Sequence, residues 1–128
     1  GAVFQDSDVA KWLEAVAYTL AEKPDKELKK LADSVIELIG RAQEPDGYFN
    51  TYFILKEPGQ RFRNLREGHE LYTLGHMIEA AVAYKRRLVK NGFWRLYRRW
   101  RIWWQILSEW KRENAWECLG IRKLSWLL

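Results

Sequence analysis

Both histidines of this 128-residue chain, His69 and His76, stand in the segment GHELYTLGH. On one helix their spacing of seven residues spans almost two turns, which places them on one face about 10 Å apart. That distance is too long for both rings to bind one metal ion, unlike the i, i+4 pair of an HExxH zinc site. Two interpretations stay open. They are interfacial or capping histidines, which the spacing alone favours, or they form a polar helix end that hydrogen-bonds a ligand.

Two other groups of residues could carry chemistry. The segment EPDGYFNTYF, residues 44–53, alternates aromatic and polar side chains, which suits a sugar site because aromatic faces pack on the C–H groups of sugar rings. Turn chemistry alone favours another interpretation, a turn at residues 45–47 followed by a short extended segment. Asp6 and Asp8 could form a carboxylate pair, but a helix N-cap followed by a first-turn acid explains both.

Three amphipathic helices must position these residues. The first follows a candidate cap at Asp6-Ser7-Asp8 and has apolar residues at helical spacing over residues 9–20. A proline turn leads to a second apolar stripe over residues 28–42, and a third helix begins near residues 65–70. The loop before the third helix has about twenty residues, long enough to indicate a functional role. The sequence predicts an all-α fold.

Charge and tryptophan content divide the chain in two. Residues 1–84 carry a net charge of −4 and residues 85–128 one of +9, which together give +5. Seven of the eight Trp follow Tyr84, and such a break is typical of a domain boundary or an interaction tail. The single cysteine, Cys118, excludes an intrachain disulfide and a cysteine cluster for metal. No signal peptide or membrane-spanning run is visible, which favours a cytoplasmic protein.

Four stretches, in order along the chain, resemble one enzyme family. The chain is similar to the catalytic domain of glycoside hydrolase family 127, the β-L-arabinofuranosidases, in "FQDSDVAKWLEAVAYTLA", "AQEPDGYFNTYF", "LKEPGQRFRNL" and "GHELYTLGHMIEAAVAY". This resemblance covers about residues 3–84, so residues 1–84 are interpreted as a fragment of that domain. It implies part of a six-hairpin α/α barrel, or toroid, much longer when complete. It also implies hydrolysis of terminal β-L-arabinofuranosides or related plant-type glycans.

The resemblance assigns roles only where the motifs match. Family members place the histidine of HELY at the sugar subsite, here His69, and a neutral imidazole can accept from one hydroxyl while donating to another. The further candidates for substrate binding are Glu70, His76, Asp6 and Asp8. The family uses a zinc-held cysteine nucleophile and a glutamate acid/base, none of which matches a position in residues 1–84. The resemblance therefore assigns this chain no catalytic residue, metal ligand or cofactor, although zinc is expected in the full-length enzyme.

The basic, Trp-rich residues 85–128 depart from the family pattern, which continues with "ADLVADTFG" and "PGHQEIELAL". Residues 117–128, "ECLGIRKLSWLL", can be encoded by codons that read "MPGHQEIELAL" from the third base. The same frame turns Trp103-Trp104-Gln105 into Val, Ala and then Asp or Asn, matching "VAD". We therefore interpret residues 85–128 as a frameshift product of a single-base deletion near the codons of Tyr84 and Lys85, without selected function. Cys118 lies outside the family's catalytic cysteine motif.

Two alternatives for this tail stay open. A Trp-rich face opposite several arginines would form a basic amphipathic helix on an anionic membrane, which makes a helical binding protein the second function class. Interleaved Arg and Trp could also bind single-stranded nucleic acid, a partner we do not expect. We expect the chain to be inactive because the catalytic groups are missing. We also expect it to self-associate through apolar faces that the missing helices would cover.

Overall fold

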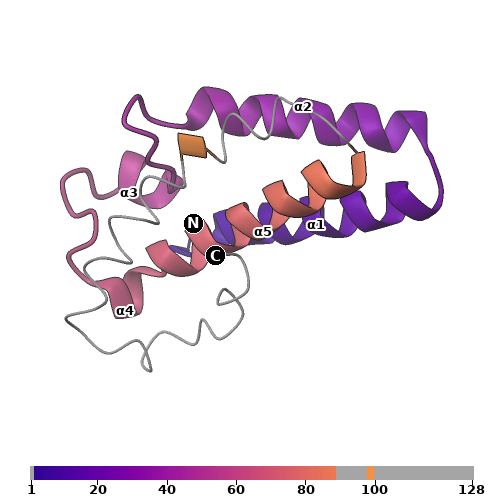
Figure 1. Cartoon of the computed structure of the whole chain (residues 1–128). Coiled ribbons are helices and arrows are strands. Elements are labelled where there is room, and N and C mark those ends of the chain that lie inside the picture. The colour runs from indigo at the N-terminus through magenta and orange to yellow at the C-terminus, as the bar shows by residue number, and fades with distance from the viewer. Residues whose placement is uncertain (1, 89–97, 100–128) are drawn as a thin grey trace.

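The computed structural model describes residues 2–88 and 98–99. Its named elements are all helices: α1 (Gln5–Glu22), α2 (Lys26–Ala42), α3 (Thr51–Leu55), α4 (Leu65–Gly68) and α5 (Glu70–Leu88). The three long helices form the body, and the short α3 and α4 lie toward one end of it (Figure 1). The all-α prediction is therefore confirmed. Among these helices, none has both the length and the apolar character that crossing a membrane requires.

α1 begins one turn earlier than the sequence predicts. Its N-cap is Phe4, whose carbonyl oxygen accepts from the hydroxyl of Ser7 at 2.7 Å and from its N–H at 3.0 Å. The prediction of an N-cap within residues 6–8 is therefore wrong, because Asp6 and Asp8 both lie in the first turn. Negative side chains interact favourably with the helix dipole at that position. Of the apolar residues that follow, Val9 is exposed and Trp12 is partly buried, whereas the others are buried: Ala10, Leu13, Val16, Ala17 and Leu20.

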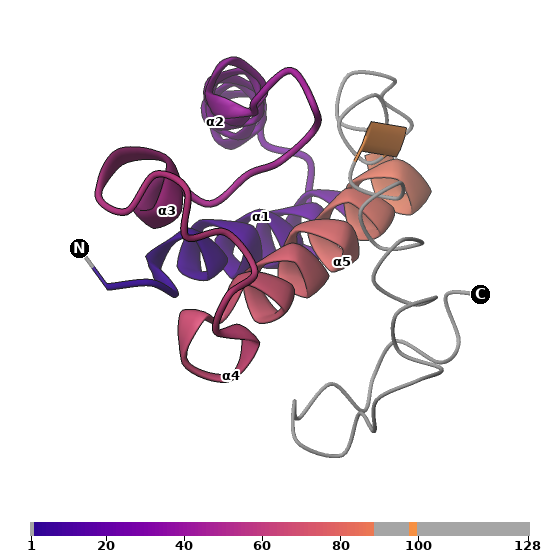
Figure 2. The ribbon, with the colours of Figure 1, turned by 90° about the vertical axis from the view of Figure 1, so that its left-hand side faces the viewer.

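The core lies mainly between α1 and α5, which pack along each other, whereas α2 contacts α1 over a smaller area (Figure 2). α2 is capped by the carboxylate of Asp25, which accepts from the N–H of Leu28 at 2.9 Å. One face of α2 contributes Ala32, Ile36 and Ile39 to the core. The sequence places Leu31 on that same face, but Leu31 is 53% exposed, and Leu38 is 56% exposed. α2 therefore carries an outward apolar face.

Tyr84 links α5 to α2. This side chain is fully buried, and its hydroxyl donates to the carboxylate of Asp33 on α2 at 3.2 Å. The helix continues to Leu88, beyond the domain boundary predicted at residue 84. The interpretation of residues 85–128 as a frameshift product stays a prediction. Its key positions, residues 103–105 and 117–128, lie outside the described residues.

α3 is an element that the sequence analysis missed. The predicted turn at residues 45–47 is confirmed, since the N–H of Gly47 donates to the carbonyl of Glu44 at 2.8 Å. Residues 48–50, directly after the turn, are not helical, and Asn50 is extended, but the chain becomes helical at Thr51, where two side chains cap α3. Asn50 accepts from the first N–H groups of α3. Asp6, reaching from α1, accepts from the N–H and hydroxyl of Thr51 at 2.6 and 2.8 Å.

Candidate functional site

His69 lies at the junction of α4 and α5 rather than inside one predicted helix. It is the C-cap of α4 and has left-handed backbone angles, φ 51° and ψ 22°. Residues other than glycine seldom adopt this conformation, and those that do are concentrated at functional positions. Its Nδ1 lies 2.7 Å from the carbonyl oxygen of Glu67. Because a carbonyl only accepts, Nδ1 carries the proton, and Nε2 of the neutral ring is an acceptor.

Aromatic rings surround His69 and connect it to His76. The ring of Phe4 lies 5.8 Å from His69, and Tyr72 lies 5.9 Å from His69 and 4.6 Å from His76, all in edge-to-face geometry. Lys11 of α1 places its ammonium 5.1 Å from the centre of the Tyr72 ring. Both histidines thus contact one tyrosine, although only His76 lies within α5. Nδ1 of His76 lies 3.3 Å from the carboxylate of Glu79 on the same helix.

Glu70, the residue after His69, is an internal anchor. It is only 3% exposed. One carboxylate oxygen accepts from the hydroxyl of Tyr48, and the other accepts from the N–H of Phe62 at 2.7 Å. Burial raises the pKa of the Glu70 carboxyl above its ordinary value, against the lowering effect of these two hydrogen bonds. Both oxygens are therefore occupied within the protein, so the geometry favours a structural role for this candidate over direct contact with substrate.

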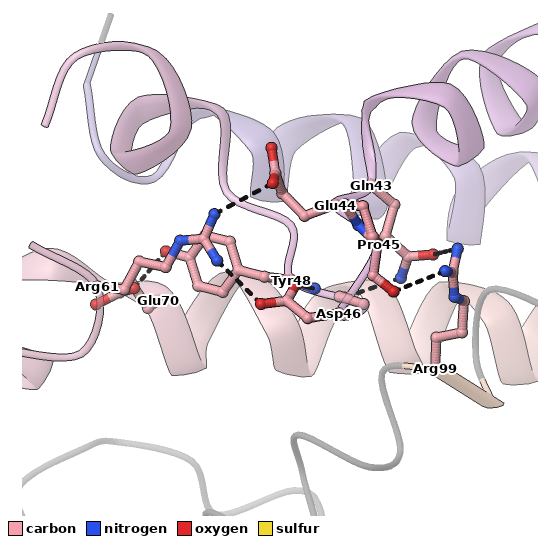
Figure 3. A network of polar contacts seen from close by, with 9 residues as sticks. Gln43, Glu44, Pro45, Asp46, Tyr48, Arg61, Glu70 and Arg99 are labelled. Atoms are coloured by element: carbon pink, nitrogen blue, oxygen red, sulfur yellow. Dashed lines mark hydrogen bonds and ion pairs between the residues drawn. The ribbon is translucent and has the colours of Figure 1, made fainter. Parts of the chain in front are cut away.

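Tyr48 and Arg61 extend this anchor into a polar network (Figure 3). The Arg61 guanidinium lies 4.0 Å from the centre of the Tyr48 ring, a cation–π contact. The same guanidinium pairs with Asp46 at 3.1 Å and with Glu44 at 3.6 Å. Burial and the bond to Glu70 raise the pKa of the Tyr48 hydroxyl far above its usual value, so that it stays a donor. The network ties the turn, the following loop and the start of α5 together.

The other side of the turn is closed by Gln43 and Arg99. Gln43 donates to the carbonyl of Gly47 at 3.0 Å. The guanidinium of Arg99 donates to the carbonyl of Pro45 at 2.9 Å and to the side-chain oxygen of Gln43 at 3.4 Å (Figure 3). Gly47 has φ +90°, and a Cβ there would lie 3.2 Å from Arg99. A glycine is therefore required at this turn.

Asp6 and Asp8 do not work as a carboxylate pair. Both oxygens of Asp6 accept from Thr51, whereas Asp8 points to the surface and pairs with Lys11 at 3.4 Å. Among the described residues, no three His, Cys, Asp or Glu side chains gather in a way that could hold a metal ion. These residues do not fit a zinc site, and no chemical step is assigned to zinc here. Cys118 lies outside the described part of the chain.

Sequence reasoning missed Tyr48 and Arg61 as the anchors of the site. Tyr48 was visible only as one aromatic of a possible sugar-stacking segment, and Arg61 only as one basic residue of a loop. The residues they hold, Asp46 and Glu70, lie fifteen and twenty-two positions away. The one local signal was the Pro45-Asp46-Gly47 turn itself, which places Tyr48 at a fixed position relative to α2.

Comparison with known proteins identifies the family. The family model for the β-L-arabinofuranosidase, GH127 catalytic domain, matches residues 1–119. A non-reducing end β-L-arabinofuranosidase from Bifidobacterium longum subsp. longum is 53% identical over an alignment of 88 residues that covers 66% of this chain. A crystal structure of a GH127 β-L-arabinofuranosidase from Geobacillus stearothermophilus T6 superimposes with a TM-score of 0.76 at 65% identity, over 78% of this chain.

A second solved GH127 β-arabinofuranosidase superimposes with a TM-score of 0.73 at 40% identity, also over 78% of this chain. The chain spans 13% of the Bifidobacterium protein and 16% and 17% of the two solved chains. The resemblance carried by the four sequence motifs is thereby confirmed, and the hydrolase interpretation is favoured over the binding protein with a membrane-surface tail. The chain belongs to glycoside hydrolase family 127, with its matched residues in the β-L-arabinofuranosidase catalytic domain.

Proposed function

We propose that this chain is part of a six-hairpin α/α-barrel enzyme that hydrolyses terminal β-L-arabinofuranosides of plant-type glycans. The proposal is supported by the family match and by relatives named β-L-arabinofuranosidases. The family resemblance implies retention through a covalent glycosyl–cysteine intermediate. The resemblance assigns neither the nucleophile nor the acid/base to a residue of this chain, so the chain alone has no glycosidase activity.

His69 is the residue proposed to contact the sugar. One observation carries this role: its Nδ1 proton is committed to the carbonyl of Glu67, which makes Nε2 an acceptor. A furanose hydroxyl can donate to that nitrogen, and the edges of Phe4 and Tyr72 hold the ring. His76 stands at the far end of the same aromatic row and is the second candidate. Glu70 and Asp6 support the site from inside.

A chimera tests this proposal. Residues 3–84 of this chain replace the matching segment of the Geobacillus enzyme, and hydrolysis of p-nitrophenyl β-L-arabinofuranoside is measured. We expect the chimera to be active. We expect His69→Ala to lower kcat/KM by about tenfold to a hundredfold, because a sugar hydroxyl loses its acceptor. The comparison variant is His76→Ala, which removes the second candidate, the other histidine of the row.

The outcomes separate the parts of the proposal. An active chimera in which His69→Ala has no effect would remove His69 from the sugar site, and a loss confined to His76→Ala would move the site along the row. Turnover of the α-linked p-nitrophenyl arabinofuranoside in place of the β-linked one would contradict the substrate class. Turnover by the purified 128-residue chain itself would contradict the proposal that it is inactive.

We also propose that the chain self-associates. The large apolar side chains with the greatest exposure are Leu31, Leu38 and Leu55, at 53%, 56% and 75%. Leu31 and Leu38 are seven residues apart on α2 and therefore lie on one face of that helix. An outward apolar face of this kind favours contact with another apolar surface. For the isolated 128-residue chain, a second copy of the chain offers such a surface.

A further inference from the structure

The left-handed backbone of His69 requires an explanation, because this conformation is unfavourable for a residue with a side chain. It persists where neighbouring contacts leave the chain no alternative. Both flanking residues meet that condition. On the N-terminal side, Gly68 is buried, and a Cβ built there would lie 3.1 Å from the ring of Phe53 and 3.5 Å from a carboxylate oxygen of Glu70. α4 is therefore pressed directly onto α3 just before His69.

On the C-terminal side, Glu70 is fixed from two directions. Its hydrogen bonds go to the hydroxyl of Tyr48, in the turn after α2, and to the N–H of Phe62, in the loop before α4. Tyr48 is itself held by the guanidinium of Arg61 over its ring (Figure 3). The peptide after His69 is therefore tied to two segments that lie outside α5. With both sides fixed, the backbone of His69 cannot relax to ordinary helical angles.

We propose that Glu70, held by Tyr48, is a positioning residue for His69. By fixing the left-handed peptide, it brings Nδ1 of His69 to the carbonyl of Glu67 and leaves Nε2 as the acceptor for a ligand hydroxyl. The inference rests on the proposed role of His69 in sugar binding and deepens it. Glu70 thus determines the ring tautomer of His69, and so whether Nε2 accepts from the sugar, although its own carboxylate does not touch the sugar.

If Glu70 only stabilised the loop, it would have no effect on the ring of His69. The two roles differ in what a variant does to the imidazole. The chain contains only two histidines, so labelling with ¹⁵N-histidine gives two sets of ring signals, and His76→Gln assigns them. At a pH where the ring is neutral, we expect the full-length chain to show His69 protonated on Nδ1, the less common tautomer of a free imidazole.

The test compares three variants at the positioning carboxylate and its neighbour. We expect Glu70→Ala to shift His69 toward the Nε2-protonated tautomer and to weaken binding of methyl β-L-arabinofuranoside by about tenfold. Glu70→Gln restores the wild-type signals, because its amide can accept from the N–H of Phe62 and donate to the oxygen of Tyr48. Glu67→Gln is the matched control: it removes a nearby exposed carboxylate but keeps the backbone carbonyl that accepts from Nδ1.

Tyr48→Phe keeps the test decisive if Glu70→Ala fails to fold, because it removes a single hydroxyl and is expected to shift the tautomer in the same direction. The inference is overturned if either folded variant leaves the ring signals of His69 as in the wild type. A tautomer shift in a chain whose His69 signals do not respond to the glycoside would overturn the sugar-binding role and leave the positioning role intact. If wild type and Glu70→Ala bind the glycoside equally, and the His69 signals of both respond to it, the positioning role is overturned and the sugar-binding role is left intact.

Discussion

Replacing Tyr48 by Phe isolates one hydrogen bond of the anchor. The Tyr48 side chain is 3% exposed, and its hydroxyl donates to Glu70. The phenylalanine ring keeps the edge-to-face contact with Phe62, at 5.4 Å between centroids, and the cation–π contact with Arg61. The variant therefore removes only the donor and leaves one oxygen of a buried carboxylate without its partner.

The size of the loss follows from that unpaired oxygen. A buried acceptor left without a donor costs about 1–3 kcal/mol, more than the net value of a typical hydrogen bond. With a urea dependence of about 2 kcal/mol per M for a chain of this size, the midpoint of unfolding falls by about 0.5–1.5 M. Without the Tyr48 donor, the pKa of Glu70 moves further above its ordinary value, because that hydrogen bond is what lowers it most.

Urea unfolding followed by far-ultraviolet circular dichroism measures this change, since the described part of the chain is helical. Tyr52→Phe is the matched control, because its hydroxyl also donates to a glutamate, Glu57, at 2.7 Å, but at the surface. Water replaces that bond, so the control has no measurable effect on the midpoint. If both variants shift the midpoint equally, the buried contact between Tyr48 and Glu70 contributes nothing special and the reasoning is refuted.

Three further predictions concern other positions. The pKa of Glu70 is raised above its ordinary value of 4.5, so the folded chain binds this proton more strongly than the unfolded chain. Its stabilising effect is complete below that value and is lost as the pH rises through the folded pKa. In Glu70→Gln, the free energy of unfolding measured with urea decreases less between about pH 4 and pH 8 than in the wild type. An unchanged pH profile would exclude Glu70 as the cause of the decrease. The buried hydroxyl of Thr73 has no hydrogen-bond partner among the described residues. Thr73→Val keeps the shape and raises the free energy of unfolding by about 1 kcal/mol, whereas a loss of stability would reveal a missed partner. Leu31→Lys combined with Leu38→Lys raises the monomer fraction in sedimentation velocity at unchanged helix content; if the fraction stays the same, association uses another surface.

The sequence predicts the three long helices well, because each buries a stripe at helical spacing that is long enough to recognise. It fails at α3, whose five residues are too few to show a period. Aromatic and β-branched residues there also favour an extended interpretation. Besides the local N-cap Asn50, Asp6, forty-five residues earlier, caps this helix by accepting from Thr51. A contact at that separation leaves no local signal.

The site shows the same limit at the level of single residues. The sequence singles out His69 and Glu70 together, as two polar neighbours with one possible role. In the fold their roles diverge, because Glu70 points inward to Tyr48 while His69 occupies the break between two helices. Asn64 and Gly68 are cap and break signals at that point, but neither predicts left-handed angles at a histidine. Those angles come from the packing of Gly68 on Phe53 on one side and, as proposed above, from the hydrogen bonds of Glu70 on the other.

The proposed sugar contact and the catalytic groups of the family separate in this chain for a structural reason. The contacts that fix His69 come from Phe4, Glu67 and Tyr72 directly, and from Tyr48 through Glu70. All of them lie in residues 4–72, and all except Glu67 stand inside the four stretches that carry the family motifs. Arg99, the described residue of the predicted tail that contacts the turn, touches its far side at Gln43 and Pro45. The geometry proposed to receive a sugar hydroxyl is thus complete within a segment to which no nucleophile or acid/base is assigned. We therefore expect such a segment to orient a furanose without cleaving it.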